Sequence, residues 1–185
     1  MRTFIAIDMD EAIKYELNAF IEVLRKHPVN IKWVHSQGMH LTLKFLGETR
    51  EDKISDIQKV LDNTTVSTGL FTLNIKGTGW FPPGKRSPRV LWVGCNENKI
   101  LMSLQSKIEN NLEELHFLKE KRNYHPHLTL GRVRNNQNIN KLLDEFILNK
   151  DKNFGRMDVS KITFFQSILK PAGAEYKMLS EHNLK

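Results

Sequence analysis

The sequence predicts an α+β fold with largely antiparallel sheets, and three observations lead to this class. Strand-like and helix-like segments are mixed along the chain without the strict βαβ alternation of a parallel sheet. The tetrapeptide HLTL occurs twice, at residues 40–43 and 127–130, once in each half of the chain. Each copy lies in a predicted strand that has a predicted helix before it and another after it. We therefore expect two lobes related by a pseudo-repeat.

Strands are indicated by β-branched and aromatic residues, by apolar–polar alternation and by short apolar runs. Phe71, Leu73 and Ile75 alternate with polar residues, which is typical of a half-buried strand. The predicted strands are Thr3–Asp8, Ile31–Val34, Met39–Leu46, 71–76, Val90–Cys95, His127–Val133, Ser160–Leu169 and Glu175–Ser180. Between them, GTGWFPPGKRSPR at residues 77–89 has three prolines and three glycines and is predicted to be an irregular loop.

Helices are indicated by apolar residues at a spacing of three or four. Ile13, Leu17 and Ile21 follow this spacing, and Asp10 is a suitable N-cap residue for the helix that contains them. The predicted helices are Glu11–Lys26, Glu51–Leu61, Lys99–Phe117 and Ile139–Ile147.

Composition narrows the class of protein. A chain of 185 residues suits one compact domain or two small lobes folded together, and its net charge of +7 favours a polyanionic partner. The single cysteine, Cys95, excludes an internal disulfide framework and indicates a reducing compartment. No segment has the length and apolar character of a signal peptide or a membrane span, so we expect a cytoplasmic protein.

The HLTL repeat can supply acid–base chemistry. Side chains alternate between the two faces of a strand, so His40 and Thr42 share one face, as do His127 and Thr129 in the second copy. Two histidines can divide acid and base work near neutral pH. Threonine hydroxyls can donate hydrogen bonds to a phosphoryl oxygen as negative charge builds on it.

The residue types that the two HLTL motifs lack argue against metal-dependent and nucleophilic catalysis. The motifs bring no carboxylate cluster for Mg²⁺, no carboxylate or cysteine as a third zinc ligand, and no serine or cysteine nucleophile with an evident partner. We therefore expect neither a metal nor a cofactor, although a two-histidine metal protein is one alternative. Attack by water on a reactive phosphodiester, such as a strained 2′,3′-cyclic phosphate, fits the residues best.

Four blocks carry a family resemblance that covers essentially the whole chain: MRTFIAID, HLTLKFLGE, PRVLWVG and HPHLTLGRV. In this order they resemble the two-histidine (2H) phosphoesterase superfamily, and within it the RNA 2′,3′-cyclic phosphodiesterases, historically called 2′-5′ RNA ligases. The resemblance implies one domain over residues 1–185, with two antiparallel sheets and outer helices around a central cleft. It also implies that His40 donates a proton and that His127 accepts one.

The activity that this resemblance implies is metal-independent hydrolysis of RNA 2′,3′-cyclic phosphate ends to 2′-phosphomonoesters by a monomer. Small cyclic nucleotides are further candidate substrates. One alternative is reversible 2′-5′ RNA ligation at the same site, although no sequence feature indicates a site for a second RNA end. Another is a noncatalytic protein that binds RNA ends, but binding alone does not need two histidines.

Further residues near the motifs are weaker candidates for binding substrate. Lys44 is expected on the face of His40 and Thr42, whereas Arg132 points away from the site unless a bulge near Gly131 turns it back. The remaining candidates fall into three groups. The loop residues Lys85, Arg86 and Arg89 are expected either to guide RNA or to form a solvated turn. Trp80 and Phe81 could stack a base, whereas Trp92 is expected in the core. His125 and His182 are expected at the surface, with the border of the cleft as the alternative for His125.

Overall fold

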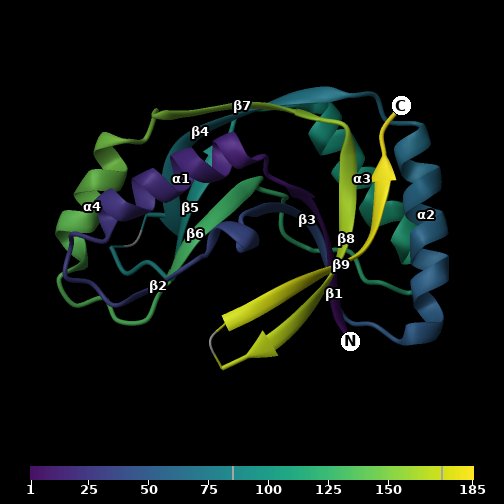
Figure 1. The fold of residues 1–185 in the computed structure, drawn as a ribbon, viewed down its shortest axis with the longest axis horizontal. Coiled ribbons are helices and arrows are strands. Elements are labelled where there is room, and N and C mark those ends of the chain that lie inside the picture. Colours follow the sequence, from purple (N-terminus) through teal and green to yellow (C-terminus); the bar gives the residue numbers. More distant parts are fainter. Residues whose placement is uncertain (85, 172) are drawn as a thin grey trace.

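The computed structural model describes residues 1–84, 86–171 and 173–185, which form nine strands, four α-helices and two short 3₁₀ turns. The strands are β1 (Arg2–Asp8), β2 (Ile31–Trp33), β3 (His40–Glu48), β4 (Phe71–Phe81), β5 (Val90–Cys95), β6 (His127–Val133), β7 (Asn153–Val159), β8 (Lys161–Lys170) and β9 (Gly173–Asn183). The helices are α1 (Glu11–Leu24), α2 (Ile54–Val66), α3 (Lys99–Glu113) and α4 (Ile139–Leu148) (Figure 1).

The strands pair antiparallel in the order β7-β4-β5-β6-β3-β1-β8-β9, with β2 added to β6. Among the described residues, the pairing of β3 with β6 is limited to Leu41↔Leu128. The α+β class and the antiparallel pairing are therefore confirmed. The two expected sheets are joined through this one residue pair into a continuous ladder.

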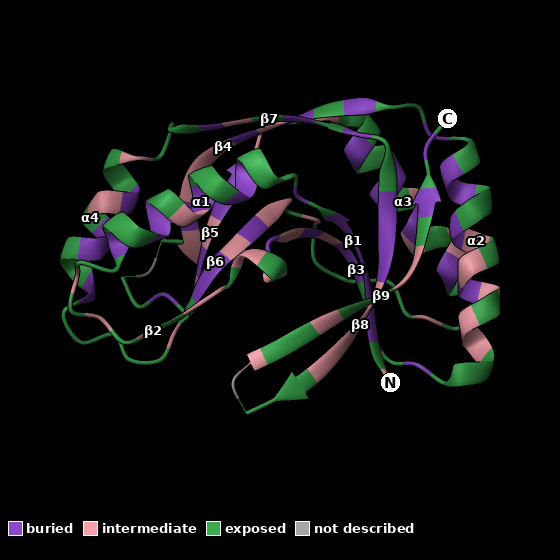
Figure 2. Cartoon of the chain, in the orientation of Figure 1, coloured by how far each residue is buried: buried purple, intermediate pink, exposed green. Residues whose placement is uncertain are grey.

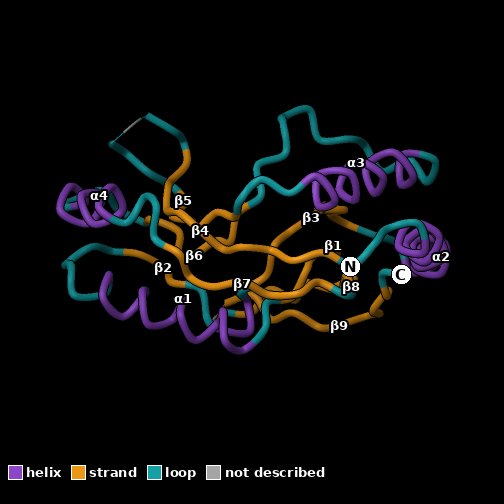
Figure 3. Tube along the Cα trace, turned by 90° about the horizontal axis from the view of Figure 1, so that it is seen from above, coloured by secondary structure: helices purple, strands orange, loops and turns teal. Residues whose placement is uncertain are grey.

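We define the first lobe as β1, β3, β8 and β9 with α2 and α3, and the second lobe as β2 and β4 to β7 with α1 and α4. Figure 1 and the turned view in Figure 3 place α1 and α4 at one end of the strands and α2 and α3 at the other. Each lobe thus contains a helix that follows a strand of the other lobe. Helix α1 follows β1 but packs against β7, and α3 follows β5 but packs against β3 and α2. This exchange ties the lobes together beyond their single strand pair.

The apolar residues that predicted the helices face the sheet. Ile13, Leu17 and Ile21 of α1 are almost fully buried, and the Asp10 carboxylate accepts a hydrogen bond of 2.8 Å from the Ile13 amide, as predicted for an N-cap. Buried residues concentrate on the strands and on the helix sides that face them (Figure 2). Phe20 of α1 shows how the second lobe is packed, since its ring contacts Phe146 of α4 and Phe154 of β7.

Several predicted boundaries were wrong, and one strand was missed. Helix α2 covers Ile54–Val66 rather than Glu51–Leu61. Residues 77–81 continue strand β4 instead of starting the loop, because residues 78–81 pair with Val90–Val93 of β5. Helix α3 ends at Glu113 rather than Phe117, and His116 has a φ of 68° that no α-helix continues through. Strand β7 was not predicted, because Gly155 (φ 116°) interrupts a short polar segment that becomes a strand only by pairing with β4.

Candidate active site

The two HLTL segments meet at their centres. Leu41 and Leu128 form the residue pair between β3 and β6, and both are 1% exposed. Because side chains alternate along each strand, the polar residues of both motifs point to the opposite side from these leucines. We call this surface the histidine face and define it by four half-buried residues: His40, Thr42, His127 and Thr129.

The antiparallel sense of the pair sets the order of these four side chains. His40 and Thr129 lie on one side of the Leu41–Leu128 pair along the strands, and Thr42 and His127 lie on the other side. Each side of the pair therefore has a histidine from one motif and a threonine from the other. The histidine face thus carries an imidazole and a hydroxyl from each lobe.

His40 lies in an aromatic pocket of the first lobe. Its ring centroid is 4.7 Å from that of Phe4, 4.9 Å from Tyr176 and 6.0 Å from Phe165. Burial, and secondarily the positive charge of Lys14, lowers the pKa of His40 to about 4. With this pKa the ring of His40 is neutral in the free protein at neutral pH, whereas a proton donor must carry a proton when substrate is bound.

His127 has a corresponding set of neighbours from the second lobe. Its ring lies 5.1 Å from Phe81, 6.4 Å from Trp92 and 6.3 Å from His125 between centroids. Burial lowers its pKa, and the charges of His125 and Arg132 act in the same direction, whereas a hydrogen bond to the His125 backbone opposes them.

That backbone hydrogen bond determines which nitrogen of His127 is free. Nδ1 lies 2.7 Å from the carbonyl oxygen of His125. A carbonyl can only accept, so Nδ1 carries the proton, and in the neutral ring Nε2 keeps its lone pair. The ring is thus oriented with a proton-accepting nitrogen available.

A bulge follows the fourth residue of each motif and changes the direction of the side chains beyond it. In β3 the partners of Ile5 and Ala6 are Lys44 and Thr42, so Leu43 has no partner of its own. In β6 the partners of Leu91 and Trp92 are Gly131 and Thr129, so Leu130 is the extra residue. One extra residue reverses the alternation of a strand.

Lys44 is turned away from the histidine face by its bulge, so its predicted role in binding substrate was wrong. The side chain is 2% exposed and forms an ion pair with Glu109 of α3. Its ammonium also donates to the backbone oxygen of Leu118 at 2.8 Å. Lys44 therefore holds α3 and the segment after it against the first lobe.

Arg132 is turned onto the histidine face by the matching bulge. Burial lowers the pKa of His127, and the positive charge of Arg132 adds to that shift. Burial raises the pKa of Tyr176, whose ring contacts His40, and the charge of Arg132 opposes that rise. The guanidinium is exposed and lies near residues from both lobes. Sequence reasoning had named a bulge near Gly131 as the condition for this placement, but it could not determine that the bulge exists.

Other candidates divide between the histidine face and the rest of the molecule. Trp92 was expected in the core, but it is half-buried and pairs with Thr129 on the histidine face, while Trp80 packs against the core. His125 is exposed and contacts Trp92 at 4.9 Å between centroids. His182 was expected at the surface, but it is 3% exposed and hydrogen-bonds Asp62 of α2, because this end of β9 is covered by the helix.

The described arginines of the basic loop before β5 lie away from the histidine face, although their charge had suggested a role in guiding RNA. Lys85 lies outside the described residues. Arg86 pairs with Asp144 of α4 at 3.7 Å, and Arg89 is exposed, with its backbone amide donating to Phe81 at 2.7 Å. Neither described arginine has a recorded contact with the histidine face.

Sequence reasoning missed three residues that shape this site. Phe4 and Tyr176 cover His40, and the Tyr124 hydroxyl donates a 2.9 Å hydrogen bond to the backbone oxygen of Thr42. The alternation of the first strand could have placed Phe4 on one face with Ala6. No local pattern indicates Tyr124 or Tyr176, because their neighbours come from distant parts of the chain.

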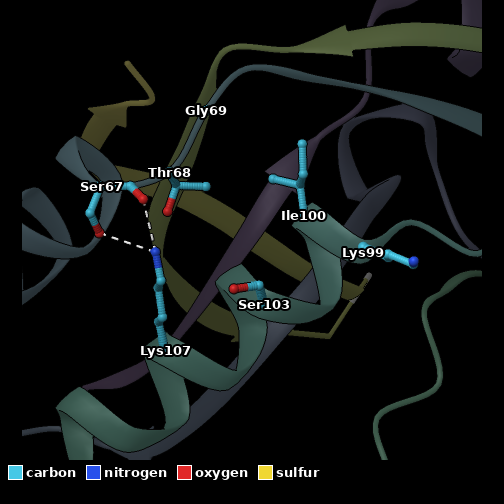
Figure 4. Close-up of a pocket in the computed structure, with 7 residues that line it drawn as sticks. All are labelled: Ser67, Thr68, Gly69, Lys99, Ile100, Ser103 and Lys107. Atoms are coloured by element: carbon cyan, nitrogen blue, oxygen red, sulfur yellow. Dashed lines mark hydrogen bonds between the residues drawn. The ribbon is translucent and has the colours of Figure 1, made fainter.

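In the part of the chain that the structure describes, other kinds of site lie away from the histidine face or lack the residues they need. Within residues 1–84, 86–171 and 173–185, no group of three His, Cys, Asp or Glu side chains is arranged to hold a metal ion. A pocket of about 260 Å³ lies between the end of α2 and the start of α3 (Figure 4). There Lys107 donates to the backbone and hydroxyl oxygens of Ser67 at 2.8 and 3.2 Å, which joins the two helices and involves no residue of the histidine face.

Comparison with known proteins gives consistent matches. Residues 14–168 match the family model of the 2′-5′ RNA ligase superfamily. The chain is 38% identical over 183 residues to a Thermotoga maritima protein named RNA 2′,3′-cyclic phosphodiesterase, covering 98% of this chain and 94% of the relative. A Methanocaldococcus jannaschii protein of the same name is 37% identical over 181 residues, covering 98% and 99%.

Solved structures share the fold. A Thermus thermophilus protein superposes with a TM-score of 0.83 at 25% identity, covering 100% of this chain and 98% of the other. E. coli LigT complexed with 3′-AMP superposes with a TM-score of 0.80 at 24% identity, covering 99% and 97%. No helix in the described part of the chain is long and apolar enough to cross a membrane.

Proposed function

Because this chain belongs to the 2′-5′ RNA ligase superfamily, we propose that it hydrolyses RNA 2′,3′-cyclic phosphate ends to 2′-phosphomonoesters without a metal ion. The observation that carries the proposal is the pairing of Leu41 with Leu128, which puts both histidine–threonine sets on one surface. The names of the Thermotoga and Methanocaldococcus relatives support the same activity. The catalytic unit is the whole chain, residues 1–185, acting as a monomer, since one chain supplies both motifs.

In the proposed reaction His127 is the general base. Its Nε2 takes a proton from a water molecule, and the water oxygen attacks phosphorus. The bond from phosphorus to the 3′-oxygen breaks, and His40, as general acid, gives a proton to that oxygen. The hydrogen bond from Nδ1 to the His125 carbonyl supports the base role, because it leaves Nε2 free to accept.

The acid role of His40 needs a proton that the free protein lacks at neutral pH. With a pKa of about 4, the buried ring is neutral before substrate arrives. A phosphodiester carries a negative charge, and an opposite charge within a few ångströms favours the protonated imidazole. Substrate binding therefore raises the pKa of His40, and the ring takes up a proton as the complex forms.

The remaining groups of the histidine face stabilise charge on the phosphoryl group. Thr42 and Thr129 donate hydrogen bonds to its nonbridging oxygens, one from each lobe. Arg132 supplies a positive charge, and its effect on the pKa values of both His127 and Tyr176 supports a position within reach of the phosphate. The reaction then needs no metal for charge stabilisation.

RNA is the proposed substrate class, and the cytoplasm the proposed location. The net charge of +7 favours a polyanion, and Phe45, 68% exposed one residue beyond Lys44, offers a surface for a nucleobase. Cys95 is the only cysteine in the sequence, so no internal disulfide can form, which suits a reducing compartment.

The direct test is incubation of an oligonucleotide ending in a 2′,3′-cyclic phosphate with the protein in EDTA. We expect a product with a 2′-phosphate, identified by its resistance to a 3′-phosphatase and by phosphorus NMR. A His40→Ala/His127→Ala double variant serves as the control for contaminating phosphodiesterases. Loss of activity in EDTA with recovery on added Mg²⁺ or Zn²⁺ contradicts the metal-free mechanism.

The same assay separates the alternatives. Addition of an oligonucleotide with a 5′-hydroxyl tests ligation, which would give a longer product joined through a 2′-5′ bond. Binding without any turnover would indicate a protein that only holds RNA ends.

A further inference from the structure

A second pocket, of about 410 Å³, lies where β4, β5 and the start of β6 meet. Its lining includes Lys76, Trp92, Gly94, His125, Pro126 and Lys150. We propose that it binds the nucleotide preceding the RNA end, with its phosphate at the two lysines and its base against the aromatic wall. This inference rests on the proposed function and adds a substrate subsite to it.

The pocket shares a wall with the surroundings of His127. Trp92 and His125 both line it, and their ring centroids are 4.9 Å apart. The same rings lie 6.4 Å and 6.3 Å from the His127 ring. An RNA strand whose last phosphate meets His127 therefore reaches this wall with the neighbouring nucleotide.

The charge of the pocket suits an RNA phosphate. Among the described residues, Lys76 and Lys150 make no ion pair or side-chain hydrogen bond, and the one carboxylate in the lining is Glu97. Lys44, by contrast, is neutralised by Glu109, and Lys107 in the smaller pocket is bonded to Ser67. Lysines free of protein partners beside a reactive phosphate site are available to an incoming polyanion.

The backbone around the lysines is held in place before any ligand binds. The Gly77 amide donates to the Lys152 carbonyl at 2.8 Å, which joins the bulge of β4 to the segment that carries Lys150. Gly77 has a φ of 82°, and a Cβ there would lie 2.8 Å from the Lys150 oxygen, so the two segments approach as closely as glycine permits.

A glycine in the pocket lining leaves room for a ligand, because it has no side chain to fill the space. A Cβ on Gly94 would lie 3.2 Å from the Lys76 oxygen and 3.3 Å from the Trp92 ring. Aromatic side chains in a basic groove bind single-stranded RNA with little sequence preference, since every base has a stacking face. We therefore expect the subsite to accept any base.

The test compares three substrates that differ only in length: a nucleoside 2′,3′-cyclic monophosphate, a dinucleotide with the same end and a longer oligonucleotide. Only the last two carry a preceding phosphate. We expect kcat/KM to rise from mononucleotide to dinucleotide and to change little beyond it. In a Lys76→Met/Lys150→Met variant the ratio of dinucleotide to mononucleotide kcat/KM should fall about tenfold or more.

The salt dependence gives an independent readout. For single strands, log kcat/KM falls with log salt by about 0.7 per phosphate contact, so on the longer oligonucleotide the variant should lose a slope of roughly one such contact. A Lys53→Met/Lys59→Met variant is the matched control, because it removes the same charge beside or within α2, which covers the side of the first lobe opposite the histidine face. Its substrate ratio and salt slope should equal those of the unchanged protein.

Failure of the subsite and failure of the proposed function give different results. If the unchanged protein cleaves all three substrates and the lysine variant keeps the same ratio, the subsite is wrong and the function stands. If the protein cleaves none of them, the function is wrong. The subsite is then tested separately, by measuring the affinity for a dinucleotide with a 2′-phosphate end by fluorescence anisotropy. Equal affinity of the lysine variant and the unchanged protein rejects the subsite.

Discussion

The strands β3 and β6 carry the same HLTL sequence but use their next two residues differently. Both strands bulge after the fourth residue, so the fifth side chain turns toward the core and the sixth toward the histidine face. In β3 these residues are Lys44 and Phe45, and in β6 they are Gly131 and Arg132. The comparison shows that one repeated motif supplies the shared chemistry, while the residues just beyond it differentiate the lobes.

The fifth position is structural in both strands, but for different reasons. Lys44 reaches α3 and pairs with Glu109. Gly131 leaves room for β2, because a Cβ there would lie 2.7 Å from Ile31 and 3.0 Å from Trp33. The first lobe thus uses a long side chain to hold a helix, and the second uses no side chain so that a strand can pack closely.

The sixth residue points to the histidine face in both strands, but the two residues differ in chemistry. Phe45 is 68% exposed and packs partly on Phe4, with 5.8 Å between ring centroids. Arg132 brings a positive charge near His127 and Tyr176. An apolar ring suits a base and a guanidinium suits a phosphate, so the pseudo-repeat offers one of each.

The largest expected difference between the lobes concerns the two histidines. Loss of a general acid or base typically costs ~10²–10⁴-fold, so His40→Ala and His127→Ala should each lower kcat in that range. A substrate with a better leaving group needs little help from the acid, and it should rescue His40→Ala far more than His127→Ala. Single-turnover rates with both substrates measure this. Equal rescue would contradict the division of roles, and stronger rescue of His127→Ala would reverse it.

Substitution of Lys44 should lower mainly the stability of the protein, whereas substitution of Arg132 should lower mainly its activity. Lys44→Met leaves the Glu109 carboxylate buried without its partner, and breaking a buried ion pair costs about 3–5 kcal/mol of unfolding free energy. Urea unfolding should show this loss, while kcat/KM of the folded variant should change only a few-fold.

Arg132→Met should behave in the opposite way. A hydrogen bond to a charged group is worth about 1.5–3 kcal/mol, so kcat/KM should fall roughly 10- to 150-fold with little change in unfolding free energy. Arg132→Lys is the matched control and should recover part of the activity, since it keeps the charge but not the planar fork. If Lys44→Met loses activity and Arg132→Met loses stability, the assignment of the two bulges is wrong.

The pH dependence should reflect the different surroundings of the two rings. The reactive state holds one proton on the histidine pair, and in the free protein the pKa of His40 is about 4 and that of His127 lies below 6.5. The kcat/KM profile should therefore peak between about 4 and 6.5 and fall about tenfold per pH unit on the alkaline side. The alkaline limb of the kcat profile should lie at higher pH than that of the kcat/KM profile, because the bound phosphate raises the pKa of His40 in the complex.

Lys14 offers a control for this profile. Its charge lowers the pKa of His40, so Lys14→Met should move the acid limb of kcat/KM to higher pH. An unchanged limb would mean that a group other than His40 titrates there.

The smallest expected effect concerns the two threonines. Thr42→Val and Thr129→Val each remove one hydrogen bond to phosphate, which is worth about 0.5–1.5 kcal/mol, or roughly 2- to 13-fold in kcat/KM. The proton chemistry stays intact, so the pH profile should keep its shape. Because the two threonines hold equivalent positions, each one residue from the Leu41–Leu128 pair, the two losses should be similar, and a much larger loss at one would show that the phosphate lies closer to that lobe.

The sequence by itself determined most strands and helices and the polar pairs of the motifs. Alternation along a strand is local, so His40 with Thr42 and His127 with Thr129 could be assigned to shared faces without any structure. The quoted sequence blocks also indicated the family, which the comparisons confirm. These conclusions needed only neighbouring residues, and for that reason they held.

Only the tertiary structure decided the placement of Lys44 and Arg132, the existence of β7 and the protonation of His40. A bulge depends on how a strand meets its partner, and β7 depends on pairing with β4, so neither follows from local propensity. The pKa of His40 is lowered by burial and by the charge of Lys14, and Phe4, Phe165 and Tyr176 pack around its ring. These residues come from three other strands, and only the folded chain brings them to His40.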